Sequence, residues 1–200
     1  MSIAIVKYNA GNVFSVSCAM KRIGVEAVVT ADPAELRRAD KVIFPGVGEA
    51  SSAISHLRSC GLDEVIKSLT QPVLGICIGM QLLCRSSEEG NVQCMGVFDD
   101  VDVRRFDNVG RPEFKIPHTG WNTISVTDPA NGIISPELDG SHLYYVHSYY
   151  APLSQFTIAT TDYLLPYSAA LHRGNFYGTQ FHPEKSGSVG EQILRKFISL

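Results

Sequence analysis

The stretch Pro72-Val73-Leu74-Gly75-Ile76-Cys77-Ile78-Gly79 joins an apolar strand to the start of a helix through a tight turn. Further apolar runs at 2–6, 25–30 and 41–44 precede it, and each is followed by a helical pattern, at 13–23, 33–39 and 49–69. Strands that alternate with helices predict a parallel sheet covered on both faces. Such a sheet keeps its functional site at the carboxyl ends of its strands, so the pattern predicts an α/β fold with Cys77 at that edge.

The second half of the chain has a different pattern. Short strands are expected at 101–105, 123–126, 143–146 and 157–160. The segments 168–171 and 176–181 flank the turn Arg173-Gly174-Asn175 and predict a hairpin, and a last helix follows Gly187. No linker interrupts the chain, so residues 1–200 are expected to form one domain.

Composition excludes several classes of function. The chain has 17 Lys and Arg against 20 Asp and Glu, a formal net charge of −3, and no basic block that would indicate binding to nucleic acid or a membrane surface. The apolar stretch 72–84 is shorter than the roughly 20 residues that cross a bilayer. Five scattered cysteines without a C-x-x-C pair, and an N-terminus that reads as a strand, predict a reduced, cytoplasmic protein.

Metal and cofactor sites are not expected either. The spacing of Cys77, Cys84 and Cys94 matches no zinc motif, and H-E-x-x-H is missing from the sequence.

Cys77 occupies the centre of a G-x-C-x-G turn. The glycines of such a turn allow a sharp strand-to-helix connection that lifts the central side chain above the sheet. Positive partial charge at a helix N-terminus favours a thiolate, which is the nucleophilic form of cysteine. These residues predict a nucleophile, although a small buried apolar cysteine fits the same pattern.

His182 is the candidate base for that nucleophile. It ends the apolar run 176–181 and precedes Pro183 and Glu184. Residues i and i+2 of an extended segment point the same way, so Glu184 is placed to orient the imidazole, as the acid of a nucleophile–base–acid triad does. A surface His-Pro-Glu turn is the alternative interpretation.

A third feature is the turn Pro45-Gly46-Val47-Gly48, which follows the run 41–44. Two glycines around one β-branched residue allow backbone N–H groups to point outward, where they would stabilise a tetrahedral oxyanion. An ordinary strand-to-helix turn fits equally well.

Together these residues resemble the class I, triad-type glutamine amidotransferases. The match consists of the segment Gly75-Ile76-Cys77-Ile78-Gly79-Met80-Gln81 and, far downstream, Phe181-His182-Pro183-Glu184, with the turn 45–48 between strand and helix. Within this family, the segments 10–12, 117–122, 146–149 and 185–187 are similar to those of glutaminase subunits of imidazole glycerol phosphate synthase. The resemblance spans essentially the whole chain. It implies a flavodoxin-like, mostly parallel sheet with helices on both faces and an added antiparallel strand region in the second half.

The resemblance also implies roles for individual residues. It assigns catalysis to Cys77, His182 and Glu184, and the oxyanion hole to Val47, Gly48 and Ile78. It assigns glutamine binding to Gln81, Ser148 and Tyr149, and partner contact to Asn12, Trp121, Tyr144 and Lys185.

The expected reaction is hydrolysis of L-glutamine to glutamate and ammonia, without a cofactor. The resemblance implies a separate (β/α)8-barrel cyclase subunit, in a heterodimer, that uses the ammonia to form imidazole glycerol phosphate and aminoimidazole carboxamide ribotide in histidine biosynthesis. Two alternatives stay open: a glutaminase subunit of a different amidotransferase, and a non-catalytic relative.

Overall fold

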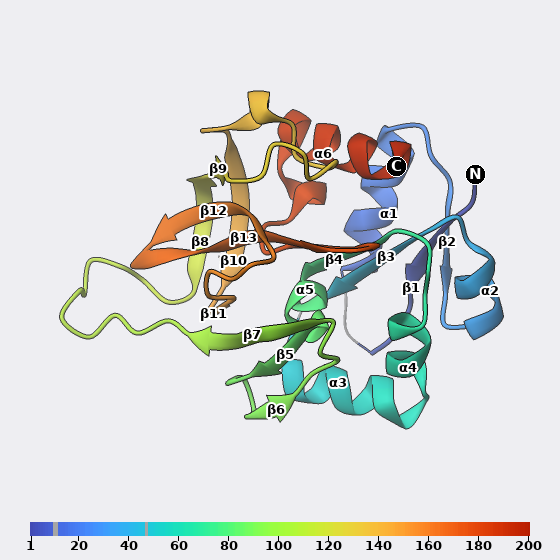
Figure 1. Cartoon of the computed structure of the whole chain (residues 1–200), viewed down its shortest axis with the longest axis horizontal. Coiled ribbons are helices and arrows are strands. Elements are labelled where there is room, and N and C mark those ends of the chain that lie inside the picture. The colour runs from blue at the N-terminus through green and yellow to red at the C-terminus, as the bar shows by residue number, and fades with distance from the viewer. Residues whose placement is uncertain (10–11, 47) are drawn as a thin grey trace.

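The structure, a computed structural model, describes residues 1–9, 12–46 and 48–200, so the predicted oxyanion residue Val47 lies outside the described residues. At its centre is an eight-stranded sheet in the order β2-β1-β3-β4-β14-β13-β12-β9 (Figure 1). The first five of these strands run parallel. They are β2 (Ala27–Thr30), β1 (Ile3–Val6), β3 (Lys41–Gly46), β4 (Val73–Cys77) and β14 (Phe176–Thr179). This strand order is that of flavodoxin-like folds, which confirms the predicted fold class.

Helices cover both faces of this sheet. In Figure 1, α1 (Val13–Arg22) and α6 (Gly187–Ser199) lie above it, and α3 (Ala50–Ser59), α4 (Leu62–Lys67) and α5 (Ile78–Leu83) lie below. The short helix α2 (Pro33–Arg38) packs against α4 and β1. The predicted start of α2 is confirmed, because the Asp32 carboxylate accepts a hydrogen bond from the Ala34 N–H at 2.8 Å. Within the helical pattern 49–69, Gly61 predicts a break, and the structure confirms it, with φ at 70° between α3 and α4.

The antiparallel region of the second half extends the sheet. Strands β13 (Leu165–Arg173), β12 (Thr157–Tyr163) and β9 (Ser125–Val126) add to β14 in antiparallel succession, and Gly174 (φ 59°) closes the predicted hairpin. The remaining strands form two smaller sheets. One pairs β8 (His118–Thr123) with β10 (His142–His147), and the other contains β11 (Tyr149–Tyr150), β7 (Phe98–Arg105), β5 (Cys84–Ser87) and β6 (Val92–Gln93). Two short 3-10 helices, η1 (Pro136–Leu138) and η2 (Pro183–Lys185), complete the elements.

Two predicted elements were wrong. The strand expected at 123–126 is two strands in different sheets, because β8 ends at Thr123 and β9 begins at Ser125. The sequence also predicts a helix that begins over 79–85; the observed helix begins at Ile78 and ends at Leu83, because Cys84 enters β5 and pairs with Phe98 of β7.

The glycines of the G-x-C-x-G turn serve close packing. A Cβ on Gly79 would collide with the carbonyl oxygen of Phe44 in β3, and one on Gly75 would lie 2.8 Å from the Met80 nitrogen. Neither glycine has a positive φ; the residue that does is Cys77 itself, at 54°. The expectation that glycine flexibility makes this turn was therefore wrong in detail: the glycines let α5 lie directly against β3 and β4.

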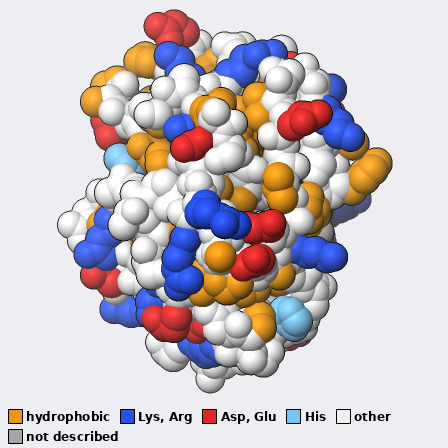
Figure 2. Space-filling model, turned by 90° about the vertical axis from the view of Figure 1, so that its right-hand side faces the viewer, with side chains coloured by type: hydrophobic (Ala, Val, Ile, Leu, Met, Phe, Trp, Pro, Cys, Tyr) orange, Lys and Arg blue, Asp and Glu red, His pale blue; other side chains and the backbone are white. Residues whose placement is uncertain are grey.

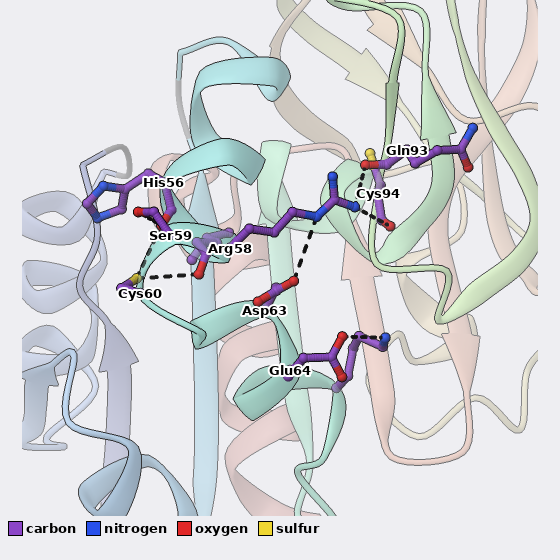
Figure 3. Close-up of polar contacts among 10 residues, drawn as sticks. His56, Arg58, Ser59, Cys60, Asp63, Glu64, Gln93 and Cys94 are labelled. Carbon is purple, nitrogen blue, oxygen red and sulfur yellow. Dashed lines mark hydrogen bonds and ion pairs between the residues drawn. The ribbon is translucent and has the colours of Figure 1, made fainter.

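Polar contacts on the surface often join elements that are distant in the sequence. Figure 3 shows Arg58 of α3 donating to the Gln93 carbonyl at 2.9 Å and lying 3.7 Å from the Asp63 carboxylate, which ties α3 to α4 and β6. On the face drawn in Figure 2, acidic and basic side chains are interspersed among apolar ones. Across the described ranges, no helix is both long and apolar enough to cross a membrane.

Candidate active site

Cys77 stands at the junction of β4 and α5, in a left-handed backbone conformation with φ 54° and ψ −111°. Non-glycine residues rarely adopt such a conformation, and it is often found where a side chain must be aimed at a functional site. Cys77 lines a cavity of about 370 Å³ next to the end of β3, where Gly46 is its pairing partner. Only 4% of the residue is exposed, so the expected exposed thiol is instead a buried one that faces a cavity.

His182 and Glu184 meet as their spacing predicts. Nδ1 of His182 donates to Oε1 of Glu184 at 2.8 Å, and both side chains are buried. Because the carboxylate accepts this bond, the other ring nitrogen, Nε2, is the one free to act on Cys77. The same Oε1 accepts from Asn12 Nδ2 at 3.3 Å, so a residue predicted to face a partner also touches the triad carboxylate.

Charges inside the site favour the protonated form of His182. Burial alone would lower its pKa, but the negative charges of Cys77 and Glu184 and the hydrogen bond to Glu184 raise the pKa well above its usual value. Nε2 is buried and makes no hydrogen bond of good geometry with any described residue. Catalytic hydrogen bonds are often long before substrate binds. The arrangement therefore suits a thiolate beside an imidazolium.

The cavity collects most of the residues that the sequence predicts for the site. Besides Cys77 and His182, its predicted lining residues are Gly48, Ile78, Gln81, Ser148 and Tyr149. Ile78 is the first residue of α5, so its N–H has no acceptor within the helix and is available to an oxyanion. Gly48 has φ 104°, which only glycine adopts readily, and it lies at the cavity wall.

The carbonyl of Tyr149 is held from two sides. It accepts from Gln81 Nε2 at 3.0 Å and from His147 Nδ1 at 2.7 Å. A carbonyl only accepts, so His147 carries its proton on Nδ1 and its Nε2 is an acceptor. This Nε2 lies 3.2 Å from Nδ1 of His118 and 3.2 Å from the Tyr167 hydroxyl. This buried pair of histidines, which the sequence analysis left unassigned, fixes the wall of the cavity at 148–149.

Both histidines are neutral at physiological pH. Burial lowers the pKa of His118 to about 4. Burial, together with the charges of His118 and His182, lowers the pKa of His147 to about 3, against the opposing bond to Tyr149.

We expect this burial to make the fold sensitive to acid. In the unfolded chain a histidine titrates near 6.5, so between that pH and the depressed folded value only the unfolded state binds the proton. The free energy of unfolding should therefore fall as pH drops below about 6.5, by up to about 1.4 kcal/mol per pH unit for His147. Urea unfolding at pH 7 and pH 5 should show a smaller pH difference for His147→Asn than for the unsubstituted chain. Replacing the exposed His142 by Asn is the control, and equal pH differences in all three proteins would contradict the assignment.

Glu89 is a cavity residue that the sequence analysis missed. It lines the cavity, and its carboxylate accepts from the Ala50 N–H at 2.8 Å at the start of α3. Burial raises the pKa of this carboxyl above its usual value. A carboxylate at the wall of a small cavity is the expected partner for an ammonium group. Glu89 is the second of two adjacent glutamates, Glu88 and Glu89, and no local motif distinguishes it.

The predicted partner-facing residues gather on one surface. Trp121 is 56% exposed, and its ring lies 5.9 Å from that of Tyr144; Lys185 Nζ lies 5.9 Å from the Tyr144 ring centre. The Tyr144 carbonyl accepts from the His182 N–H at 2.9 Å, so this surface is joined directly to the triad segment. Phe14 of α1, 81% exposed, is a further large apolar side chain that the sequence analysis did not single out.

Known proteins match over the whole chain. The family model described as glutamine amidotransferase class-I matches residues 6–200. Proteins described as imidazole glycerol phosphate synthase subunit HisH are 58% identical in Bacteroides fragilis and 42% identical in Escherichia coli, with 100% of both chains covered. Among solved structures, the glutaminase domain of Trypanosoma brucei CTPS with bound acivicin superposes with a TM-score of 0.71 at 19% identity, covering 100% of this chain and 92% of that one. PurLQS from Thermotoga maritima gives 0.69 at 16% identity, over 99% and 97%. At these identities the superpositions show a shared fold.

Proposed function

The chain belongs to the class-I glutamine amidotransferase family, and from that premise we propose that it hydrolyses L-glutamine at Cys77 for an imidazole glycerol phosphate synthase. The observation that carries the proposal is that Cys77 and His182 line one cavity and that His182 is hydrogen-bonded to the buried Glu184. Residues 1–200 then act as a single glutaminase domain. The free thiols of all five cysteines support a reducing, cytoplasmic setting.

The first half of the reaction is acyl transfer to sulfur. The Cys77 thiolate attacks the γ-carboxamide carbon of glutamine, and the carbonyl oxygen takes up the negative charge between the N–H groups of Ile78 and the turn that ends at Gly48. His182, protonated beside the thiolate, gives its proton from Nε2 to the departing nitrogen, which leaves as ammonia. A γ-glutamyl thioester and a neutral His182 remain.

The second half hydrolyses this thioester. Neutral His182 takes a proton from water through Nε2, and the hydroxide attacks the thioester carbon at the same oxyanion site. Collapse releases glutamate and restores the thiolate beside the imidazolium. Glu184 keeps Nδ1 protonated throughout, so Nε2 always faces the reacting atoms.

Substrate recognition needs groups for the amino-acid end of glutamine. Glu89 supplies a carboxylate for the α-ammonium group, and Gln81, Ser148 and Tyr149 also line the cavity.

Glu89→Gln should raise KM for glutamine by about tenfold or more with little change in kcat, because a hydrogen bond between charged groups is worth roughly 1.5–3 kcal/mol. Glu88→Gln, at the exposed neighbour that pairs with Arg104, is the matched control. A KM equal to that of the control would rule out this role for Glu89.

The partner is a cyclase subunit with a (β/α)8-barrel fold, bound as a heterodimer at the surface of Trp121, Tyr144 and Lys185. The names of the HisH relatives support a synthase partner, since each is called a subunit. Growth of a histidine auxotroph that lacks its own glutaminase subunit should be restored by this chain. Failure of that rescue, with glutaminase activity intact, would favour service to a different synthase.

A glutamine-mimicking electrophile tests the proposed nucleophile directly. Peptide mapping after treatment with 6-diazo-5-oxo-L-norleucine should find the label on Cys77, because this thiol faces the cavity beside His182. Burial raises the pKa of Cys84 well above its usual value and that of Cys94 to about 11, so neither should compete. Cys60 is exposed but does not line this cavity. Labelling of Cys60 that persists in the presence of excess glutamine would measure unspecific reaction. A label found mainly on Cys84 or Cys94 would overturn the assignment.

A further inference from the structure

Gln180 is a fully buried polar residue that the reaction described above leaves unused. It follows β14 and is 0% exposed. Its side-chain Nε2 lies 3.7 Å from Sγ of Cys77, and its Oε1 accepts from Gln81 Nε2 at 2.9 Å. Its own N–H donates to the Ala169 carbonyl at 2.8 Å, so the backbone that carries it belongs to the sheet.

We propose that Gln180 is the hydrogen-bond donor that holds the nucleophilic sulfur of Cys77 as a thiolate and links it to the glutamine-binding wall through Gln81. The inference rests on the proposed function in one respect, the role of Cys77 as nucleophile. It adds a residue to the reaction outside the triad and the oxyanion hole.

The directions of these hydrogen bonds follow from the carbonyl oxygen of Tyr149. The Tyr149 carbonyl can only accept, so the group of Gln81 that faces it at 3.0 Å is the NH2. The same NH2 faces Gln180 at 2.9 Å and therefore meets its oxygen. The nitrogen of Gln180 then faces Sγ. Gln81 thus donates both to the Tyr149 carbonyl and to Gln180, and Gln180 donates to the nucleophile, so hydrogen bonds through two side-chain amides link the cavity wall to Sγ.

The two other polar neighbours of Sγ act in different ways. The Val146 carbonyl, 3.9 Å away, only accepts, so it interacts favourably with the thiol proton and unfavourably with a thiolate. His182 favours the thiolate by its charge, but it must surrender its proton to the leaving nitrogen during the reaction. Gln180 keeps its donor at every step, because an amide does not titrate. A donor to the charged form favours that form, most strongly in a buried site.

The simpler interpretation is that Gln180 is a satisfied polar residue of the core with no effect on the sulfur. That role predicts a change in stability when the side chain is replaced, and no change in how Cys77 reactivity depends on pH. The two interpretations therefore differ in a measurable quantity that does not require glutamine turnover.

The experiment measures the rate of Cys77 alkylation by iodoacetamide against pH, in the full chain, with each cysteine followed by peptide mass spectrometry. Gln180→Met removes the donor at similar length. Gln180→Glu keeps an oxygen for Gln81 and puts a second oxygen in place of the donor. Thr179→Val is the matched control, because Thr179 is the preceding residue, is 0% exposed and has a hydroxyl without a described partner.

The midpoint of the alkylation profile should rise by about one pH unit in Gln180→Met, with the rate near pH 7 about tenfold lower, as expected for loss of a hydrogen bond to a charged group. It should rise further in Gln180→Glu, because a carboxylate repels a thiolate. Thr179→Val should follow the unsubstituted chain. Midpoints of both Gln180 variants that coincide with the control would overturn the proposal, and if one variant fails to fold, the other decides.

Glutamine hydrolysis by the unsubstituted chain with its cyclase partner is measured in parallel. If glutamine is hydrolysed and the alkylation midpoints of the Gln180 variants equal that of the control, Gln180 does not have the proposed role and the proposed function stands. Shifted midpoints without hydrolysis support the Gln180 contact and remove the proposed function. The two failures are therefore distinguishable.

Discussion

Cys77→Ala is expected to lower glutamine-dependent synthesis by about 10⁴-fold or more, to the background of the assay. The sulfur of Cys77 lines the cavity together with His182 and is the atom proposed to form the thioester, so an alanine leaves His182 without this nucleophile. The measurement is the rate of glutamate formation with the cyclase partner and its nucleotide ligand present. The same complex supplied with ammonium should keep its synthase activity, because in the proposed reaction the ammonia is consumed at a separate site on the partner.

Cys60→Ala is the matched control, since Cys60 is an exposed thiol at the end of α3 that faces no part of the cavity. It should leave the glutaminase rate unchanged. Residual hydrolysis in Cys77→Ala within tenfold of this control would mean that another group attacks glutamine. Loss of the ammonium-dependent reaction as well would point to a broken complex.

Local patterns made much of this site predictable. His182 and Glu184 are two residues apart, and Cys77 ends a strand whose boundaries the apolar run reveals. The alternation of strands and helices over residues 2–83 predicts Cys77 at the carboxyl edge of a parallel sheet. The structure brings His182 to the same edge, because β14 pairs in parallel with β4. The individual binding roles came from resemblance to the family, because spacing alone left each motif open to a structural interpretation.

Residues far apart in the chain were harder to foresee. Gln180 reaches Cys77 and Gln81 only because β14 inserts beside β4, and Glu89 reaches the cavity only because β5 follows α5 without a loop. Neither carries a local signal that separates it from other Gln or Glu residues. Their roles depend on the assembled sheets.

The wrong boundaries have physical causes as well. All six residues of α5 are buried, so the helix lacks the polar face whose end would mark its last turn. In β8, Gly120 and Asn122 are weak strand formers, so the pattern did not predict a strand there. The buried Ile124, just after the end of β8, led to the predicted strand at 123–126. Pairing with β10 along the whole of β8 overrides these preferences.

Replacing the triad base should cost far more than replacing the residue that orients it. His182→Ala is expected to lower kcat/KM by about 10⁴-fold or more, because both the proton for departing ammonia and the activation of water pass through Nε2. Glu184→Gln should be about two orders of magnitude less damaging, because the amide keeps the shape of the side chain and loses only its charge and acceptor pair.

The pH profile separates orientation from mere packing. The charge of Glu184 and its bond at Nδ1 help to raise the pKa of His182, so removing them lowers that pKa. The imidazolium that protonates the leaving nitrogen is then lost at a lower pH, and the alkaline limb of kcat/KM should move toward neutrality in Glu184→Gln. Glu64→Gln, at an exposed carboxylate paired with Lys67 on α4, is the control and should keep the unsubstituted profile. An alkaline limb that does not move, with activity nevertheless lost, would show that Glu184 supports the fold of the 182–185 turn and leaves the imidazole charge untouched.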